Sequence, residues 1–201
     1  PSAGYEDEVR VVDQKPSAKN WFRDMGGNTP ETVAANFLAQ NGIIGGFADN
    51  TFRAGKLVNR AEAAKFLMLA RFKDIEDRTN SGKFWDIPDG EWYVRFVMKA
   101  AELGVINGHP DGSFRPQDPV KTGEFLKMLA LTFDLPQNLP YEYSDVHADD
   151  WFAPYVGIAA KYKFLSTRSA CAPNGCNHNA LLPGMELTRG EVAVAIYTIL
   201  N

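Results

Sequence analysis

Apolar and polar positions along the chain follow a helix–loop–helix pattern that recurs three times. In the middle unit, one face at helical spacing carries Tyr93, Phe96, Val97, Ala100 and Leu103. Three further apolar stretches, AAKFLMLARF, FLKMLALTF and VAVAIYTIL, predict a second helix in each unit that contributes to a core. Polar, turn-rich segments at 73–83 and 134–142 separate the units. The pattern therefore predicts a mainly helical protein.

A related motif at the start of each second helix sets the register of the repeat. The motifs read Asn59-Arg60-Ala61-Glu62, Lys121-Thr122-Gly123-Glu124 and Thr188-Arg189-Gly190-Glu191, at offsets of 62 and 67 residues. The loop before the third motif carries an eight-residue insertion relative to the other two. We divide the chain into an N-terminal extension or linker (1–19), copy one (20–76), copy two (77–139) and copy three (140–201, with a loop insertion at 167–180).

Capping residues mark the helix ends in this pattern. Capping boxes are expected for Asn59 with Glu62 and for Thr188 with Glu191. Copy two instead places Lys121 before Glu124, so its helix is expected to be capped one residue later, by Thr122.

First helices are expected to end at left-handed glycines, Gly42 and Gly104, whereas copy three has Lys163 at this place. The loops that follow combine an Asp turn with a buried aromatic residue, Phe52 or Phe114. Each helix pair is too small to bury its apolar face alone, so we expect the first helices to share a central core.

Composition narrows the function. The chain has 201 residues, 45% of them hydrophobic, which is typical of a globular protein. Its net charge of −4 gives no indication of binding to nucleic acid or to an anionic membrane. No run approaches the roughly 18 apolar residues of a membrane-spanning helix, and no signal peptide is visible. The two cysteines, Cys171 and Cys176, lie in one Pro/Gly/Asn loop, which predicts a small disulfide and an extracytoplasmic setting. A zinc site that includes His178 is the alternative, but a fourth ligand is not apparent.

Catalytic chemistry has little support. Of the three histidines, His109 falls in copy two and His147 and His178 in copy three, and none lies at catalytic spacing from a nucleophile. The loops DNTFRAG and DGSFRPQ place Phe and Arg where a calcium-binding loop needs oxygen ligands. We expect no enzyme activity, metal or cofactor.

An anion site is the more promising chemistry. Arg60 and Arg189 stand at the first position of their helices, where unpartnered N–H groups and the helix dipole favour a carboxylate. We expect both side chains to be largely exposed; the alternative is that they are solvated or paired with a nearby carboxylate. Copy two has Thr122 at this position, with Lys121 as a partial replacement for the charge.

For each of the other candidate ligand-binding residues, a purely structural role is the alternative. Trp92 and Trp151 either stack on a sugar face or anchor a first helix in the core. Asp49 and Asp111 either touch the ligand or only shape a turn. Gly46 and Gly108 allow close approach of the backbone, and a conformational role is the simpler reading.

At these motifs the chain resembles the S-layer homology family. Copy two carries the family's loop almost in full, as Gly104, Val105, Ile106, Gly108, Asp111, Gly112, Phe114, Arg115 and Pro116. Copies one and three carry its Arg-x-Glu helix start. The resemblance spans roughly residues 20–200, and it departs from the family at Ala54, at Thr122 and in the rebuilt loop of copy three.

The resemblance implies three repeats folded into one mainly α, pseudo-threefold domain. It also implies a non-catalytic role outside the cell: holding a surface protein on the cell wall. The ligand implied is an anionic secondary cell-wall polysaccharide bearing pyruvate ketals, gripped in grooves between repeats. The alternative is a protein–protein interaction or structural module of a surface-layer protein that has lost glycan binding.

Overall fold

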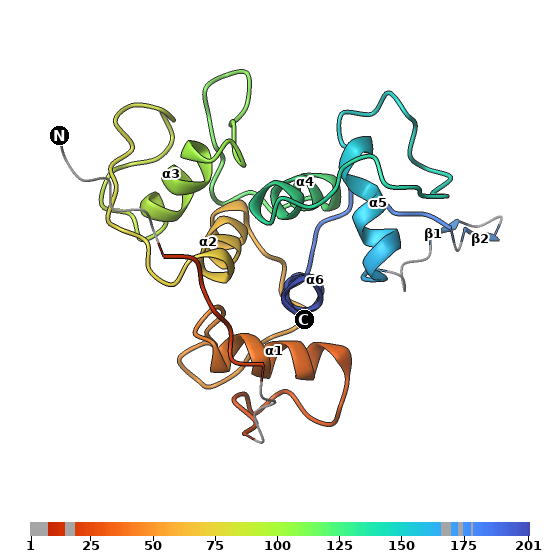
Figure 1. Cartoon of the computed structure of the whole chain (residues 1–201), viewed down its shortest axis with the longest axis horizontal. Coiled ribbons are helices and arrows are strands. Elements are labelled where there is room, and N and C mark those ends of the chain that lie inside the picture. Colours follow the sequence, from red (N-terminus) through yellow and green to blue (C-terminus); the bar gives the residue numbers. More distant parts are fainter. Residues whose placement is uncertain (1–7, 15–18, 166–169, 173–174, 178) are drawn as a thin grey trace.

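The computed structural model describes residues 8–14, 19–165, 170–172, 175–177 and 179–201. Its elements are α1 (Pro30–Gln40), α2 (Arg60–Arg71), α3 (Val94–Glu102), α4 (Thr122–Thr132), α5 (Ala153–Tyr162), β1 (Ala170–Ala172), β2 (Gly175–Asn177) and α6 (Arg189–Leu200). The two short strands pair antiparallel within the insertion of copy three, away from the helices (Figure 1). The predicted mainly helical fold is confirmed.

The second helix of each copy, not the first, lies at the centre of the molecule. Figure 1 shows α2, α4 and α6 in the middle and α1, α3 and α5 around them. Each outer helix packs on the second helix of the preceding copy: α3 on α2, α5 on α4, and α1 on α6. The expectation that the first helices share the core was therefore wrong. Eight of the 12 residues of α2 and eight of the 11 residues of α4 are buried, so the central position removes these helices from water on more than one side.

A closed ring of backbone hydrogen bonds links the three copies just before their second helices. Val58 N–H donates to the Leu187 carbonyl at 2.9 Å, Val120 N–H to Val58 at 2.9 Å, and Leu187 N–H to Val120 at 3.1 Å. All three side chains are fully buried. Each copy thus both donates to and accepts from another copy, which ties the start of every central helix to its neighbours.

Each loop is held by an aspartate that the sequence analysis did not single out. Asp86 accepts hydrogen bonds from the N–H groups of Phe114 and Arg115 at 2.7 and 2.6 Å. The same carboxylate clamp recurs in the other copies, with Asp24 on Phe52 and Arg53 and Asp145 on Leu181 and Leu182. The second residue of each pair has a left-handed φ of 57° to 59°. The clamp satisfies two backbone donors and holds that conformation in place.

The caps follow the prediction in copies one and three. Asn59 accepts from Glu62 N–H at 2.8 Å while Glu62 accepts from Asn59 N–H at 3.0 Å, and Thr188 with Glu191 forms the same box. In copy two the expected shift by one residue was wrong. The helix begins at Thr122 with Lys121 as N-cap, and only the Glu124 half of the box is left, at 3.1 Å.

The apolar positions and the ends of the first helices confirm most of the pattern predicted from the sequence. Phe96 and Val97 are buried, and the loop side chains Phe52 and Phe114 are completely so. Leu103 is an exception because it is 45% exposed, just beyond the end of α3. The expected left-handed positions are present: Gly42 and Gly104 have φ of 67° and 72°, and Lys163 has φ of 56°.

Part of the predicted linker is structured. Val9 forms a bridge with Phe72, and the Arg10 guanidinium donates to carbonyls at the ends of two helices, Asn41 at 2.6 Å and Leu69 at 2.5 Å. Gln14 donates to the Leu200 carbonyl at 2.9 Å. Residues 8–14 therefore connect copy one to the end of copy three.

Candidate functional site

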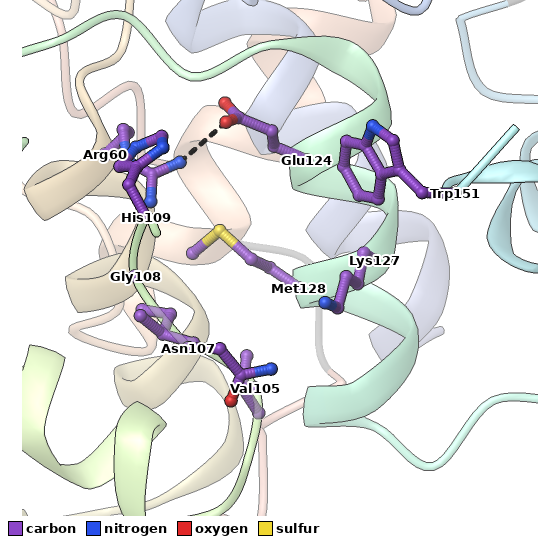
Figure 2. A pocket seen from close by; sticks show the side chains of 10 residues that line it. Arg60, Val105, Asn107, Gly108, His109, Glu124, Lys127, Met128 and Trp151 are labelled. Carbon is purple, nitrogen blue, oxygen red and sulfur yellow. Dashed lines mark hydrogen bonds and ion pairs between the residues drawn. The ribbon is translucent and has the colours of Figure 1, made fainter. Parts of the chain in front are cut away.

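Two cavities with matching walls lie between the copies. The first, which we call groove B, has a volume of about 340 Å³. Its walls are Arg60, Val105, Ile106, Asn107, Gly108, His109, Glu124, Lys127, Met128 and Trp151. Figure 2 shows Arg60 and His109 on one side, Trp151 and Lys127 on the other, and Glu124 and Met128 of α4 between them.

The second cavity, groove A, has a volume of about 210 Å³. Its walls are Gly45, Gly46, Phe47, Glu62, Lys65, Phe66, Trp92 and Arg189. From Gly45 through Phe66, each of these residues stands 62 positions before a wall residue of groove B. Each groove therefore takes its loop and helix from one copy, its arginine from a second and its tryptophan from the third.

Arg60 is held inside groove B by three different contacts. Its Nε donates to the Phe114 carbonyl at 2.9 Å, and its Nη1 lies 2.8 Å from Glu124 Oε1. The guanidinium also lies 4.9 Å from the centre of the Phe114 ring. Arg60 is only 7% exposed, so the expectation of a largely exposed side chain was wrong. The alternative, pairing with a nearby carboxylate, holds for this arginine.

Arg189 is buried as well, at 4% exposed, but its partners are different. Its Nε donates to the Phe52 carbonyl at 3.0 Å and its Nη2 to the Gly45 carbonyl at 2.9 Å. Burial lowers the pKa of Arg189, which remains protonated because arginine starts from so high a value. Among the described residues no carboxylate forms an ion pair with Arg189. The carboxylate of Glu62 pairs with Lys56 instead, with Oε1 3.5 Å from Nζ.

The N–H groups at these helix starts are not available to a ligand, which corrects the expectation from the sequence. Arg60 N–H donates to the Asp118 carbonyl at 2.9 Å, and Ala61 N–H to Pro116 at 3.0 Å. Arg189 and Gly190 donate in the same way to the loop of copy one. The loop of a neighbouring copy thus occupies the helix terminus. An anion in either groove would meet side-chain cations rather than backbone donors.

Each groove has a lysine that the sequence analysis missed. Lys65 Nζ lies 5.2 Å from the centre of the Trp92 ring, and Lys127 Nζ lies 5.8 Å from that of Trp151. Desolvation by burial lowers the pKa of Lys65, and the nearby Arg95 adds to the effect. The signal in the sequence was a lysine three residues after the capping glutamate in copies one and two.

Trp92 and Trp151 line the grooves rather than the core. They are 48% and 58% exposed, whereas Tyr93, which follows Trp92, is buried and packs edge-on against it at 5.3 Å. Phe152 packs in the same way against Trp151 at 5.4 Å. Each indole is therefore fixed by an aromatic neighbour and presents an open ring face.

Gly46 and Gly108 lie in the groove walls and are required for packing. A Cβ at Gly46 would come within 2.6 Å of the Phe22 ring and 2.8 Å of the Thr51 carbonyl oxygen. At Gly108 it would come within 2.5 Å of Phe84, and φ is +76°. Both positions therefore exclude a side chain and keep the backbone close to the cavity.

Asp49 and Asp111 lie in the turns and do not line either groove. Asp111 accepts from the Ser113 hydroxyl at 2.6 Å and pairs with Arg115 at 2.9 Å. Asp49 has the same partners in copy one, and the hydrogen bond from the Thr51 hydroxyl is the main reason that its pKa is lowered to about 2. Both carboxylates are fully occupied in holding the loop.

The third equivalent position lacks the groove side chains. Thr122 is completely buried and its hydroxyl donates to the Met185 carbonyl at 2.9 Å, while Lys121 is exposed. Val194 stands where Lys65 and Lys127 do, three residues after the glutamate. Pro30 stands six residues after the loop-clamping aspartate, as the two tryptophans do. The arginine, lysine and tryptophan are thus all replaced.

The cysteine prediction is not settled by the fold. The backbone register places Cys171 opposite Cys176 in the two-stranded hairpin. Their side chains, and His178, lie outside the described residues. The disulfide therefore stays a prediction.

Comparison with known proteins gives the chain a family context. Residues 22–64 and 83–126 match the S-layer homology domain. The chain is 29% identical to the amylopullulanase of Thermoanaerobacterium thermosulfurigenes over 188 residues, which is 90% of this chain and 9% of that protein. It is 27% identical to the cellulosome-anchoring protein of Acetivibrio thermocellus, covering 70% of this chain and 33% of that protein.

A further relative is the surface-layer 125 kDa protein of Lysinibacillus sphaericus, 27% identical over 87% of this chain and 14% of that protein. The chain therefore spans a third or less of the length of each of these relatives. Within the described residues, no helix has both the length and the apolar character needed to cross a bilayer.

Proposed function

We propose that this chain is a module of three S-layer homology repeats (20–76, 77–139 and 140–201) that anchors a longer protein to the outside of the cell wall. It does so without catalysis, by binding an anionic cell-wall polysaccharide in grooves A and B. The family match of copies one and two supports the proposal. So do the names of the relatives, which include a cellulosome-anchoring protein and a surface-layer protein.

The observation that carries the proposal is the convergence of three side chains at each of two equivalent cavities. Groove A brings together Arg189, Lys65 and Trp92, and groove B brings together Arg60, Lys127 and Trp151. These residues come from three different copies, so only the closed arrangement assembles them. A fixed cation, a second cation and an open indole face suit a sugar that bears a carboxylate.

The chemistry expected in groove A follows from its contacts. Lys65 lies beside Trp92, so a sugar stacked on the indole places its acidic substituent within reach of the ammonium group. Arg189 lies deeper, held by two carbonyls, and its remaining N–H donors can meet the same carboxylate. A pyruvate ketal, which carries a carboxylate on the sugar ring itself, fits this arrangement.

The competing function is a protein–protein interaction module in a surface layer. The third position favours it in part, because Thr122, Val194 and Pro30 stand there in place of the arginine, lysine and tryptophan. Groove A and groove B retain the full set of three side chains, so glycan binding is the better supported function.

Co-sedimentation with purified cell-wall sacculi tests the proposal. We expect the chain to sediment with untreated sacculi and to remain in solution after mild acid treatment that removes pyruvyl groups. The double variant Trp92→Ala/Trp151→Ala, checked for a native circular dichroism spectrum, should lose binding. Equal sedimentation before and after pyruvyl removal would overturn the anionic-sugar assignment, and no sedimentation at all would favour the protein-interaction function.

A further inference from the structure

A third cavity of about 370 Å³ adjoins groove A on the other side of one short loop. Its walls include Trp21, Phe22, Ala39 and Ile44, together with the loop residues 45–47. The same three loop residues line groove A. Two cavities of different composition thus share a single narrow wall.

Trp21 in this cavity shares one feature with the groove tryptophans, an aromatic residue next in the chain. It is 37% exposed, and the next residue, Phe22, is buried and packs on Phe52 with ring centres 5.1 Å apart. Trp92 with Tyr93 and Trp151 with Phe152 show the same sequence of an open indole and an aromatic neighbour. The backbone N–H of Trp21 donates to Asn36 at 3.0 Å, which fixes the platform on α1.

The charge beside Trp21 matches that of the grooves. Lys19 Nζ lies 3.9 Å from the centre of the Trp21 ring, as Lys65 lies beside Trp92. An indole face with an ammonium group next to it is the feature that suits a sugar with an acidic substituent in groove A. Trp21 is a wall residue of the third cavity, and Lys19 lies over its ring from outside the set of wall residues.

Two of the three residues in the wall between the two cavities are glycines. Gly45 and Gly46 have no side chain, and a Cβ at Gly46 would clash with Phe22 and with the Thr51 carbonyl. The Gly45 carbonyl accepts from Arg189 of groove A, so the wall is held in place from the groove side. Phe47 is the third residue of this wall, so a polymer strand that spans both cavities would cross at the two glycines.

We propose that the cavity at Trp21 is a second sugar subsite, which binds a neighbouring sugar of the same polysaccharide strand whose acidic sugar occupies groove A. The inference rests on the proposed function of groove A and extends it from a single sugar to a longer segment of polymer. The subsite belongs to groove A alone, because Lys83 stands at the position of Trp21 in copy two.

The test is calorimetric titration with two wall fragments prepared from purified polysaccharide: a single pyruvylated sugar, and an oligosaccharide of several repeating units. Groove B is silenced in all proteins by Trp151→Ala. We expect Trp21→Ala to weaken binding of the oligosaccharide roughly three- to tenfold, the scale of one aromatic contact, and to leave the single sugar unchanged. Trp21→Phe should restore part of the loss.

Trp85→Ala is the matched control, because Trp85 is an exposed indole of copy two that lines neither cavity. It should bind both fragments as the parent does. Equal affinity of Trp21→Ala and parent for the oligosaccharide would overturn the subsite and leave groove A intact. An equal loss of affinity for both fragments in Trp21→Ala would also overturn the subsite. Failure of the parent to bind either fragment would overturn the proposed function itself, and the subsite with it.

Discussion

Groove A and groove B have equivalent walls but hold their arginines in different electrostatic states. In groove B, Arg60 lies 2.8 Å from the Glu124 carboxylate. In groove A, the equivalent Glu62 lies 3.5 Å from Lys56, and Arg189 donates to backbone carbonyls instead. An arginine already paired with a carboxylate offers an incoming anion less than one that is not, so the same motif produces two anion sites of unequal strength.

The difference traces to one exposed loop position. Lys56 stands six residues before Glu62 of groove A. The equivalent position in copy two, six residues before Glu124, holds Asp118. Lys56 pairs with the Glu62 carboxylate, which still lines groove A, whereas Asp118 offers Glu124 no cation, and Glu124 pairs with Arg60. The reversal of charge at this loop position thus accompanies the difference between the two arginines. We infer that groove A is the stronger site.

The largest effect is expected from removing copy three, because each groove takes its wall residues from all three copies. A chain ending at residue 139 lacks Arg189 of groove A and Trp151 of groove B, so it should bind no polysaccharide at all. For the same reason the intact chain should unfold in a single calorimetric transition, since every outer helix packs on another copy. Three separate transitions, or binding by the truncated chain, would contradict the shared construction of the grooves.

The next largest effect is expected at the two arginines. Loss of a charge-assisted contact costs about 1.5–3 kcal/mol, or roughly ten- to more than a hundredfold in affinity. Arg189→Ala should fall in this range, and Arg60→Ala should cost less because Glu124 already neutralises Arg60. Titration with a pyruvylated fragment, at a temperature where each variant is folded, gives the comparison. Thr122→Ala is the control and should bind like the parent; an equal loss for all three variants would show that neither arginine receives the anion.

Exchanging the loop charges tests the cause of the asymmetry directly. Lys56→Asp should release Glu62 to pair with Arg189 and weaken groove A by up to about tenfold. Asp118→Lys should draw Glu124 from Arg60 and strengthen groove B by a similar factor. Each variant is measured with the other groove silenced by its Trp→Ala substitution. If neither exchange moves the affinity, the carboxylate does not set the strength of the groove.

A smaller effect is expected from pH, and only in groove B. His109 stands where groove A has Phe47, and its Nε2 is buried without a partner among the described residues. Desolvation first, and then the charges of Arg60 and Arg115, lower the pKa of His109, which is therefore neutral at pH 7. A bound carboxylate favours the protonated ring and raises that pKa, so affinity should rise as the pH falls from neutral toward the lowered pKa of the free ring.

The expected gain is a few-fold between pH 7.5 and 5.5, measured by titration of the Trp92→Ala protein. His109→Phe should make groove B as indifferent to pH as groove A, and Phe47→His should give groove A the same dependence. A pH profile that survives His109→Phe would assign the effect to another group.

The smallest effect is expected from the cysteines. The predicted disulfide between Cys171 and Cys176 closes a very short loop, which constrains the unfolded chain little. Within the described part of the chain, its hairpin also supplies no wall residue to groove A or groove B. Reduction should therefore leave the affinity of both grooves unchanged and the thermal midpoint nearly so. Two free thiols in the protein from its native compartment would disprove the bond.

The local structure could be predicted from the sequence. Capping pairs such as Asn59 with Glu62, the left-handed Gly104 and the apolar face of α3 all depend on neighbours within a few residues, which are visible in the chain as written. The repeat pattern also placed Arg60 and Arg189 at matching positions, and likewise Trp92 and Trp151. These features need no knowledge of the distant partners.

What surrounds those residues depends on the tertiary structure. The sequence did not show that the second helices take the centre, that Arg60 and Arg189 are buried, or that Asp24, Asp86 and Asp145 clamp the loops. Each of these depends on which copy packs against which, and the same motif in a different register would expose the arginines. Because the partners of Arg189 lie more than 130 residues away in the chain, their contact follows from the closed ring of copies and not from any local signal.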